Sequence, residues 1–332
     1  MSEHTGIEWT DRTWNPVTGC SKVSPGCAHC YAETVADRFW AKQYPKVEVE
    51  RVTKGALLST IQMRPRQFTD IRAHADRLDQ PLHWRKPSRI FVNSMSDLFH
   101  EDVPDEFISR VFAVMALTPQ HTYQILTKRA GRMHDYLNEM SADPDAYCFA
   151  WAREYECDDL RPTPPLEGDR WPLQNVWLGV SVENQHFANE RIPLLIKTPT
   201  AIRFISAEPL LEKILLDDGC NSWLTCTSTL TEDEYEAMTP AQQEDHNCCE
   251  SFAESGPPHF RGIDWVIVGG ESGLKARVLD VAWVRSIIAQ CKEACVPVFV
   301  KQMGRDLRKW KNPKGGDPAE WSEDLRVREF PR

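Results

Sequence analysis

The sequence has no segment typical of a membrane or secreted protein. Among its 332 residues, no run approaches the roughly 18–20 consecutive apolar residues that a membrane-spanning helix needs. The first residues, MSEHTGIEWTDRTW, contain neither a basic start nor an apolar stretch, so we expect no secretory signal. These absences predict a cytoplasmic protein with no membrane partner.

A disulfide scaffold is not expected either. The chain has 11 cysteines but no export signal, and disulfides are rare in a reducing cytoplasm. Cys20, Cys27 and Cys30 form the only tight triplet outside two acidic stretches. Metal binding or redox chemistry is therefore the better interpretation of this triplet.

Basic residues are missing from one long stretch. Residues 215–260 contain ten acidic side chains and no Lys or Arg, and residues 142–172 contain eight acidic and three basic side chains. Their net charges are −10 and −5, so the rest of the chain carries +5 within a total of −10. We interpret 142–172 and 215–260 as acidic insertions in a single domain that spans residues 1–332. A nucleic-acid partner is compatible with the mildly basic framework, although no basic run indicates one.

The chain also lacks a G-x-G-x-x-G motif opening a helix, which argues against a dinucleotide-binding fold. Instead, short apolar runs alternate with helical patterns, which predicts a parallel sheet with right-handed crossovers. With a further strand before Cys20 there are about seven βα units, so we predict an α/β fold, a partial or complete TIM-like βα barrel. The expected strands span residues 89–97, 122–129, 176–184, 202–209, 265–273 and 296–304, and the expected helices span 32–42, 105–117, 184–196 and 281–295.

Polar residues cluster where the predicted strands end. In βα barrels the carboxyl ends of the strands carry the active site. Taken singly, about half of these residues are explained as helix caps or strand terminators, but six clusters together favour a functional site. They comprise Ser94, Ser96 and Asp97; Thr127, Lys128 and Arg129; Ser181, Glu183 and Asn184; Ser206 and Glu208; Glu271 and Ser272; and Lys301 and Gln302.

The strongest local signal is the segment CSKVSPGCAHC at residues 20–30, a C-x6-C-x2-C arrangement in a loop rich in Gly, Pro and Ser. Three thiolates on one loop suit three irons of a [4Fe–4S] cluster, which four cysteines usually hold. With three ligands, one iron keeps an open position, as in catalytic metal sites. The alternative is a structural zinc site in which His29 joins the three cysteines, although the neighbours His29 and Cys30 are a poor pair for one ion.

Three further segments point to a known family. The motifs IEWTDRTWNPVTGC…CAHCYAE, ISAEPLL and WVIVGGESG closely resemble the phage Gp37/Gp68 family (the DUF5131 family). Members of that family look like radical S-adenosylmethionine (SAM) enzymes with a modified cysteine spacing. The usual spacing of that superfamily is C-x3-C-x2-C, and this chain keeps the C-x2-C pair but has a longer first gap.

The resemblance implies a specific chemistry. Cys20, Cys27 and Cys30 would ligate a [4Fe–4S] cluster, and the amino and carboxylate groups of SAM would chelate the open iron. One electron from an external donor would cleave SAM to methionine and a 5′-deoxyadenosyl radical, which would abstract a hydrogen atom from the substrate. The protein would position the reactants and exclude water. The expected barrel is therefore of the radical SAM type.

Strand-end residues are the candidates for SAM binding. Superfamily enzymes often use polar residues after the second strand, near a Gly-Gly-Glu turn, and here that turn occurs instead at residues 269–271. Its glycines would allow a close approach to a ligand. Ser94, Ser96 and Asp97 are candidates because alternate residues of a strand share one face. The cofactor-binding candidates are Ser94, Ser96, Asp97, Ser181, Glu183, Asn184 and Glu271.

Charged residues suggest contacts with the substrate. Glu208 and Lys301 are the candidate catalytic residues, and Lys128 and Arg129 are expected to face the SAM carboxylate or a nucleotide phosphate, unless they lie in a solvated loop. The expected substrate is a phage nucleotide or a modified pyrimidine base in DNA, which would be rearranged or hypermodified. The alternatives are a lyase acting on DNA lesions and a zinc-stabilised, non-catalytic phage binding protein.

The remaining cysteines are interpreted as structural. Cys291 and Cys295 are four residues apart on a predicted helix and share a face, which favours core packing. Several Cys and His residues in or near the second acidic stretch have irregular spacing, which favours ordinary surface residues over an auxiliary metal site. They are Cys220, Cys226, His246, Cys248, Cys249 and His259.

Overall fold

The computed structural model describes residues 5–40, 46–53, 56–63, 65–156, 171–217, 223–224, 262–273, 275–306 and 310–331. The helices are α1 (Tyr31–Trp40), α2 (Asp105–Leu117), α3 (Ala130–Ala142), α4 (Ala150–Glu156), α5 (Gln185–Ile196) and α8 (Val281–Glu293). The strands are β1 (Arg12–Trp14), β2 (Val17–Thr18), β3 (Lys46–Thr53), β4 (Ala56–Met63), β5 (Arg72–Ala73), β6 (Arg89–Val92), β7 (Thr122–Thr127), β8 (Val176–Ser181), β9 (Ile202–Ala207), β10 (Trp265–Gly269) and β11 (Val298–Gln302). Among these residues, no helix is long and apolar enough to cross a membrane.

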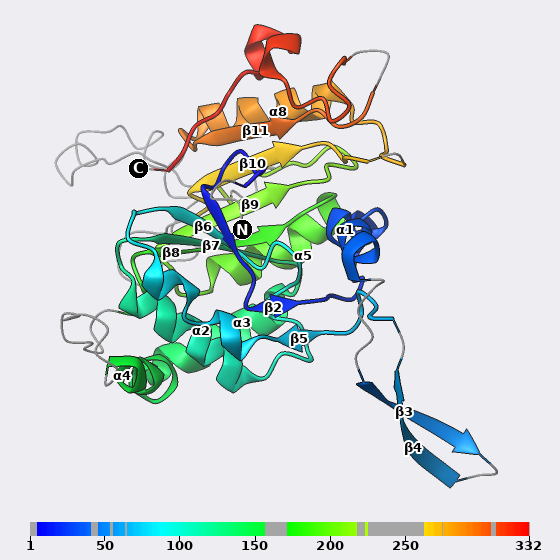
Figure 1. Cartoon of the computed structure of the whole chain (residues 1–332). Helices are drawn as coiled ribbons and strands as arrows, with labels where there is room; N and C mark the ends of the chain where they lie inside the picture. The colour runs from blue at the N-terminus through cyan, green and yellow to red at the C-terminus, as the bar shows by residue number, and fades with distance from the viewer. Residues whose placement is uncertain are drawn as a thin grey trace, which may run out of the picture.

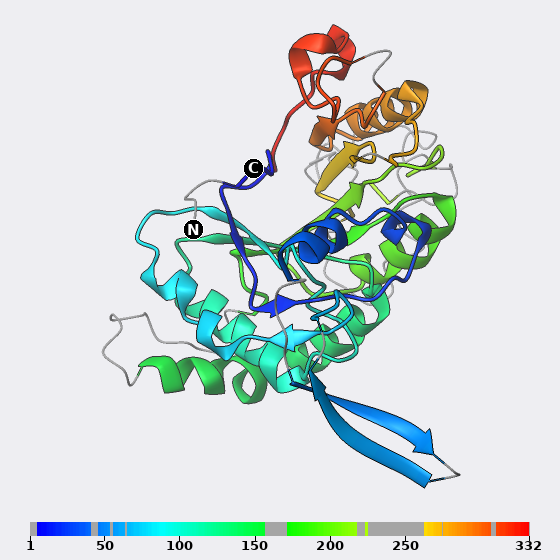
Figure 2. The same cartoon turned by 45° about the vertical axis from the view of Figure 1, so that its right-hand side comes forward.

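The centre of the molecule is a curled parallel sheet of seven strands. Its order is β1-β6-β7-β8-β9-β10-β11, and every neighbouring pair is parallel. In the described chain β1 and β11 do not pair with each other, so the sheet curves without closing (Figures 1 and 2). The prediction of an α/β parallel sheet is confirmed, and of the two barrel forms expected, the structure has the partial one.

Helices cover the outer face of the sheet, as Figure 1 shows for α2, α3, α5 and α8. The strand residues that face them are fully buried, for example Ile90, Ile125, Val180 and Val266. All four predicted helices are present. Helix α3 was not predicted, because its N-cap position is Arg129, which provides no side-chain oxygen to accept a backbone hydrogen bond.

Aromatic side chains fill the inner face of the sheet toward the amino ends of the strands. Trp9, Phe204, Trp265 and Phe299 belong to one buried cluster, in which the Trp265 ring lies 5.7 Å from that of Phe204 and 6.2 Å from those of Trp9 and Phe299. Phe330, near the end of the chain, lies 5.3 Å from Trp265. We call these five residues the aromatic floor. They close one end of the half-barrel, which leaves the carboxyl ends of the strands as the place for a site.

All six predicted strands end earlier than expected, and two of the early ends affect candidate residues. Strand β6 stops at Val92, because Asn93 has a left-handed φ of 61° and its side chain accepts a hydrogen bond from the Val17 amide at 3.3 Å. Ser94, Ser96 and Asp97 therefore follow a turn. The argument that they share one face of a strand is wrong. Likewise β8 stops at Ser181, before Glu183 and Asn184.

The structure describes only parts of the two acidic stretches. Residues 145–156 of the first are helical, and Cys148 and Phe149 are fully buried there. Residues 157–170, 218–222 and 225–261 lie outside the described residues, together with Cys220, Cys226, His246, Cys248, Cys249 and His259. An antiparallel hairpin of β3 and β4 projects from the body (Figures 1 and 2).

Candidate functional site

The cysteine loop, residues 20–30, lies at the carboxyl edge of the sheet. The Cys20 amide donates to the Phe68 carbonyl at 2.9 Å, and the preceding Gly19 pairs with Ser96 after β6. Gly19 has a φ of +100°, and a Cβ there would fall 2.7 Å from the Asp70 carbonyl oxygen, so only glycine suits this entry to the loop. Cys27 ends a short 3-10 helix (Pro25–Cys27), and Cys30 directly precedes α1.

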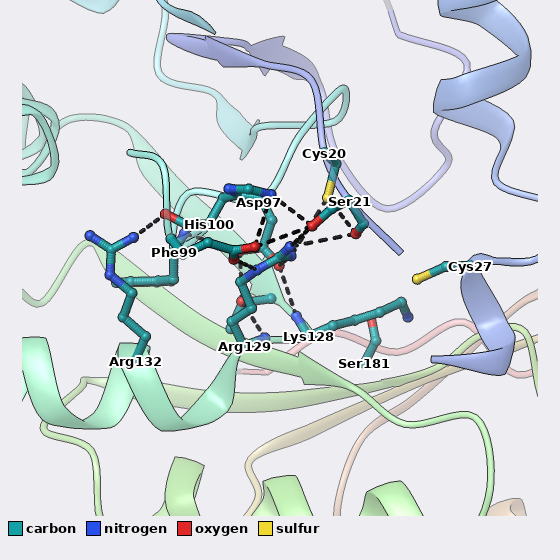
Figure 3. A network of polar contacts seen from close by, with 12 residues as sticks. Cys20, Ser21, Cys27, Asp97, Phe99, His100, Lys128, Arg129, Arg132 and Ser181 are labelled. Atoms are coloured by element: carbon teal, nitrogen blue, oxygen red, sulfur yellow. Dashed lines mark hydrogen bonds and ion pairs between the residues drawn. The ribbon is translucent and has the colours of Figure 1, made fainter. Parts of the chain in front are cut away.

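Arg129 contacts the start of this loop. Its guanidinium donates to the Ser21 hydroxyl at 2.7 Å and lies 3.6 Å from Cys20 Sγ. An ion pair of 3.2 Å joins it to Asp97, and another of 2.9 Å joins it to Glu101. Figure 3 shows that the sulfur atoms of Cys20 and Cys27 point toward the region that holds Ser21, Lys128 and Arg129. A cation at this place favours a thiolate or an anionic metal group.

Asp97 has all its acceptor positions engaged by the protein. It accepts hydrogen bonds from the Thr127 hydroxyl at 2.7 Å, from the Phe99 amide at 3.0 Å and from the Lys128 amide at 3.1 Å, in addition to the Arg129 contact. These bonds tie the end of β7 to the turn after β6. Asp97 therefore organises the edge of the sheet, and its contact with SAM stays a prediction.

Glu183 contacts the middle of the cysteine loop. Its side chain is fully buried and accepts from the Ser24 hydroxyl at 2.6 Å, from Lys128 Nζ at 2.5 Å and from Arg191 Nη1 at 3.2 Å. Burial alone would raise the pKa of Glu183, but the positive charges of Lys128 and Arg191 and the hydrogen bonds outweigh it, so the pKa is lowered. Glu183 is a buried carboxylate that two cations compensate.

Glu271 contacts the end of the loop. Arg277 binds both of its carboxylate oxygens, at 2.6 and 3.0 Å, and His29 Nδ1 lies 3.0 Å from it. Arg277 also donates to the Pro25 carbonyl at 3.0 Å. Burial raises the pKa of Glu271, but the hydrogen bonds from Arg277 and His29 lower it below the ordinary value. Both Glu271 oxygens are thus engaged by side chains of the protein, and its contact with a ligand stays a prediction.

The Gly-Gly-Glu turn approaches protein backbone. A Cβ on Gly270 would fall 2.6 Å from the Met303 carbonyl oxygen, and the Gly270 amide donates to the Gln302 carbonyl at 2.9 Å. The glycine is explained by this close packing of the segments after β10 and β11.

Glu208 and Lys301 form a separate pair at the carboxyl edge. Lys301 Nζ lies 2.7 and 2.9 Å from the two Glu208 oxygens, and Gln302 donates to the same carboxylate at 3.2 Å. Both side chains keep 17–18% of their surface exposed. Sequence reasoning named this pair, and the structure brings its members together.

The remaining candidates have local roles as well. The Ser94 hydroxyl donates to Asn15 at 3.2 Å and that of Ser96 donates to the Val17 carbonyl at 2.8 Å. The Asn184 side chain caps α5 by accepting from the Phe187 amide at 3.0 Å. Ser181 is buried at the end of β8, and its carbonyl accepts from Arg191. For Ser94, Ser96 and Asn184, a local role in a turn or helix cap accounts for the hydrogen bond that the side chain makes.

The carboxyl edge therefore carries several ion pairs, including one for each of four carboxylates that the sequence analysis named. These four are Asp97–Arg129, Glu183–Lys128, Glu208–Lys301 and Glu271–Arg277. Sequence reasoning missed Ser24, Gly26, Arg191 and Arg277. Ser24, Gly26 and Arg277 have contact partners far away in the chain. The only sequence signal for Arg191 was its position two turns along the helix that follows Glu183.

Cys20, Cys27 and Cys30 form no disulfide and are partly exposed. Burial, with smaller contributions from Asp97 and Cys27, raises the pKa of Cys20 to about 12, and Arg129 offsets only part of this. Burial also raises the pKa of Cys30. Within the described residues, no three His, Cys, Asp or Glu side chains converge as ligands of a single metal ion. The zinc arrangement with His29 is therefore not present there, and His29 contacts Glu271 instead.

Comparisons with known proteins identify a family. A search of curated proteins and a search of solved structures returned no match. A family model described as "Protein of unknown function (DUF5131)" matches residues 4–323. Since the match covers nearly the whole chain, the protein belongs to the DUF5131 family.

Proposed function

We propose that the chain is a radical SAM enzyme of the partial-barrel type. Three features support the proposal: the cysteine triplet, its place at the carboxyl edge of a parallel half-barrel, and the aromatic floor at the opposite end. The observation that carries it is the single loop bearing Cys20, Cys27 and Cys30, which polar contacts hold against three strand ends. Active sites of βα barrels lie at this edge.

The donor set fits a [4Fe–4S] cluster held by Cys20, Cys27 and Cys30. Each thiolate in such a cluster binds its own iron, so the three sulfurs need not converge on one point as the ligands of a single ion must. Arg129 beside Cys20 Sγ places positive charge next to the anionic group. When bound, the cluster would supply the electron that cleaves SAM and so generates the carbon radical that abstracts hydrogen.

The residues of this chain position and shield the reactants. Asp97, Glu183 and Glu271 fix the loop and the strand ends, while the aromatic floor excludes water from the other end of the half-barrel. Glu208 and Lys301 are candidates from the sequence that form a charged pair. Their side chains are partly exposed, and the pair does not hold the loop. We assign them to contact SAM or substrate.

For the substrate we propose a nucleotide or a modified pyrimidine base in DNA. Lys128 and Arg129 are both paired with carboxylates, so they contribute little net positive charge toward a phosphate. We therefore expect recognition of the base. DNA binding measured across salt concentrations tests this, with a log–log slope of about −2 or smaller in magnitude, equivalent to one or two phosphate contacts. A much steeper slope, typical of complexes with many phosphate contacts, would contradict recognition through the base.

The decisive experiment measures iron and records EPR spectra after anaerobic reconstitution with iron and sulfide. We expect a reduced [4Fe–4S] signal that changes when SAM is added, because SAM occupies the open iron. Cys20→Ala, Cys27→Ala and Cys30→Ala should each lose most of the bound iron. Cys295→Ser, at an exposed cysteine outside the loop, is the matched control and should retain it.

Other outcomes favour other functions. A cluster whose signal ignores SAM would indicate electron transfer or a structural role. Retained zinc with no iron would indicate the zinc-stabilised binding protein, and the enzyme proposal would then be wrong.

A further inference from the structure

Glu183 is the most completely enclosed charged group at the edge. None of its side-chain surface is exposed, and it bonds to the loop through Ser24 and to the barrel through Lys128 and Arg191. Arg191 is itself buried, with 1% exposure, and donates to the Ser181 carbonyl at 2.7 Å. A carboxylate enclosed in this way has no free oxygen for a small ligand.

The loop is shaped to lie directly on this carboxylate. A Cβ on Gly26 would fall 2.4 Å from Glu183 Cγ and 2.5 Å from its Oε1, a separation that real side chains do not tolerate. Glycine at this position therefore allows the contact. The Ser24 hydroxyl that donates to Glu183 also lies 3.6 Å from Cys27 Sγ. The Glu183 carboxylate thus determines how close the loop lies to the sheet edge at Cys27.

The barrel side of the contact is rigid. The Glu183 carbonyl accepts from the Leu211 amide at 2.8 Å, and the Val182 amide donates to the Ser206 carbonyl at 2.9 Å, so the end of β8 is fixed to the segment after β9. Within the loop, the Cys27 amide donates to the Ser24 carbonyl at 2.9 Å and the Ala28 amide donates to the Pro25 carbonyl at 3.2 Å. These two bonds are local to the loop, whereas the bonds of Val182 and Glu183 join the end of β8 to the next strand and the segment after it.

We infer that Glu183 is a positioning residue that docks the cysteine loop on the sheet edge before any metal binds. All of its contacts are made by the protein, so the loop holds its shape without a cluster. The inference rests on the proposed function only where it takes the docked loop to be a cluster-binding loop. The consequence is that metal binds a preformed triplet, and disordering the loop lowers metal loading without unfolding the barrel.

The test is hydrogen exchange of the metal-free protein in the presence of a chelator. In the wild type, the peptide that carries the Cys27 and Ala28 amides should be protected. Glu183→Gln should accelerate its exchange about tenfold, because the charge-assisted bond to Ser24 is weakened. Ser24→Ala and Gly26→Ala change the contact from the loop side and should give the same local effect even if Glu183→Gln folds poorly.

The matched control is Glu208→Gln, another strand-end carboxylate paired with a lysine but not in contact with the loop. It should leave exchange at Cys27 and Ala28 unchanged. Equal exchange in Glu183→Gln and Glu208→Gln, or an unprotected loop in the wild type, would overturn the inference.

Iron loading after reconstitution gives a second readout. A folded Gly26→Ala protein should bind less iron than the wild type. Normal iron loading in a variant whose loop exchanges rapidly would contradict the inference that metal binds a preformed triplet. If the wild-type loop is protected but no cluster forms, the proposed function fails while the docking role stands. If a cluster forms on an unprotected loop, the docking role fails alone.

Discussion

The two ends of the half-barrel are stabilised by different forces. At the amino ends of the strands, Trp9, Phe204, Trp265 and Phe299 pack ring against ring with almost no exposure. At the carboxyl ends, ion pairs engage the carboxylates that follow β6, β8, β9 and β10, and three of these pairs join different strand ends. Apolar packing is non-directional and gives stability, whereas charge pairs have fixed geometry and give position. The comparison indicates that stability and site geometry are separable in this fold.

The largest effect should come from the aromatic floor. Trp265→Ala should lower the free energy of unfolding by about 3–5 kcal/mol, because it removes a large buried ring and leaves a cavity. Urea denaturation measures this, with Trp283→Ala on α8, a half-buried tryptophan, expected to lose less. Exchange of the cysteine loop under native conditions should stay near that of the wild type. A rise in loop exchange that matches the loss of stability would show that the two ends are coupled.

A smaller effect should come from the charged edge. Asp97→Asn should cost about 1.5–3 kcal/mol, the usual range for hydrogen bonds to a charged group. The variant should also make Cys20 more reactive. Burial is the main cause of the raised pKa of Cys20, and the negative charge of Asp97 adds to it. Removing that charge should lower the pKa of Cys20 and so increase the thiolate fraction.

Alkylation by iodoacetamide, followed peptide by peptide at pH 8, measures the change at Cys20. Glu271→Gln is the control, since Glu271 contacts His29 and Arg277 rather than Cys20. Unchanged or slower alkylation in Asp97→Asn would show that Asp97 does not control the charge at this thiol.

The smallest effect should be the pH dependence from Glu271. Its pKa is lowered in the folded protein, so its contribution to stability is present above its ordinary value of 4.5 and is lost as pH falls through the lowered value. The difference in unfolding free energy between wild type and Glu271→Gln should therefore be constant above about pH 5 and shrink in more acidic solution. Trp265→Ala should show no such dependence, because no proton is exchanged there. If the difference in unfolding free energy grew in more acidic solution, the lowered pKa assigned to Glu271 would be wrong.

Much of the fold was predictable because it depends on local patterns. The runs around Ile90, Ile125 and Val266 are apolar and short, as buried parallel strands are, and the helices between them follow their expected boundaries closely. The turn at Asn93 was missed, since its left-handed backbone is stabilised by a partner in another segment. Helix α3 was missed because its first residues carry no capping signal.

The site was predictable in its location more than in its contacts. Asp97, Glu183 and Glu271 were expected at the carboxyl edge because parallel strands end there together. Their partners were not predictable, since Ser24 lies 159 residues from Glu183 and His29 lies 242 residues from Glu271. A pattern along the chain shows which side chains lie at an edge, but it does not show which partners those side chains bind.

The sequence alone determined the family, the parallel α/β architecture, and the grouping of Cys20, Cys27 and Cys30 on one loop, because each of these is expressed in motifs and periodicity along the chain. The tertiary structure decided that the sheet stays open and that aromatic rings close its amino end. It also decided that the conspicuous carboxylates hold the cysteine loop. The physical reason is that a buried charge must be compensated by whichever cation or hydroxyl the fold brings within reach, and only the folded chain sets those neighbours.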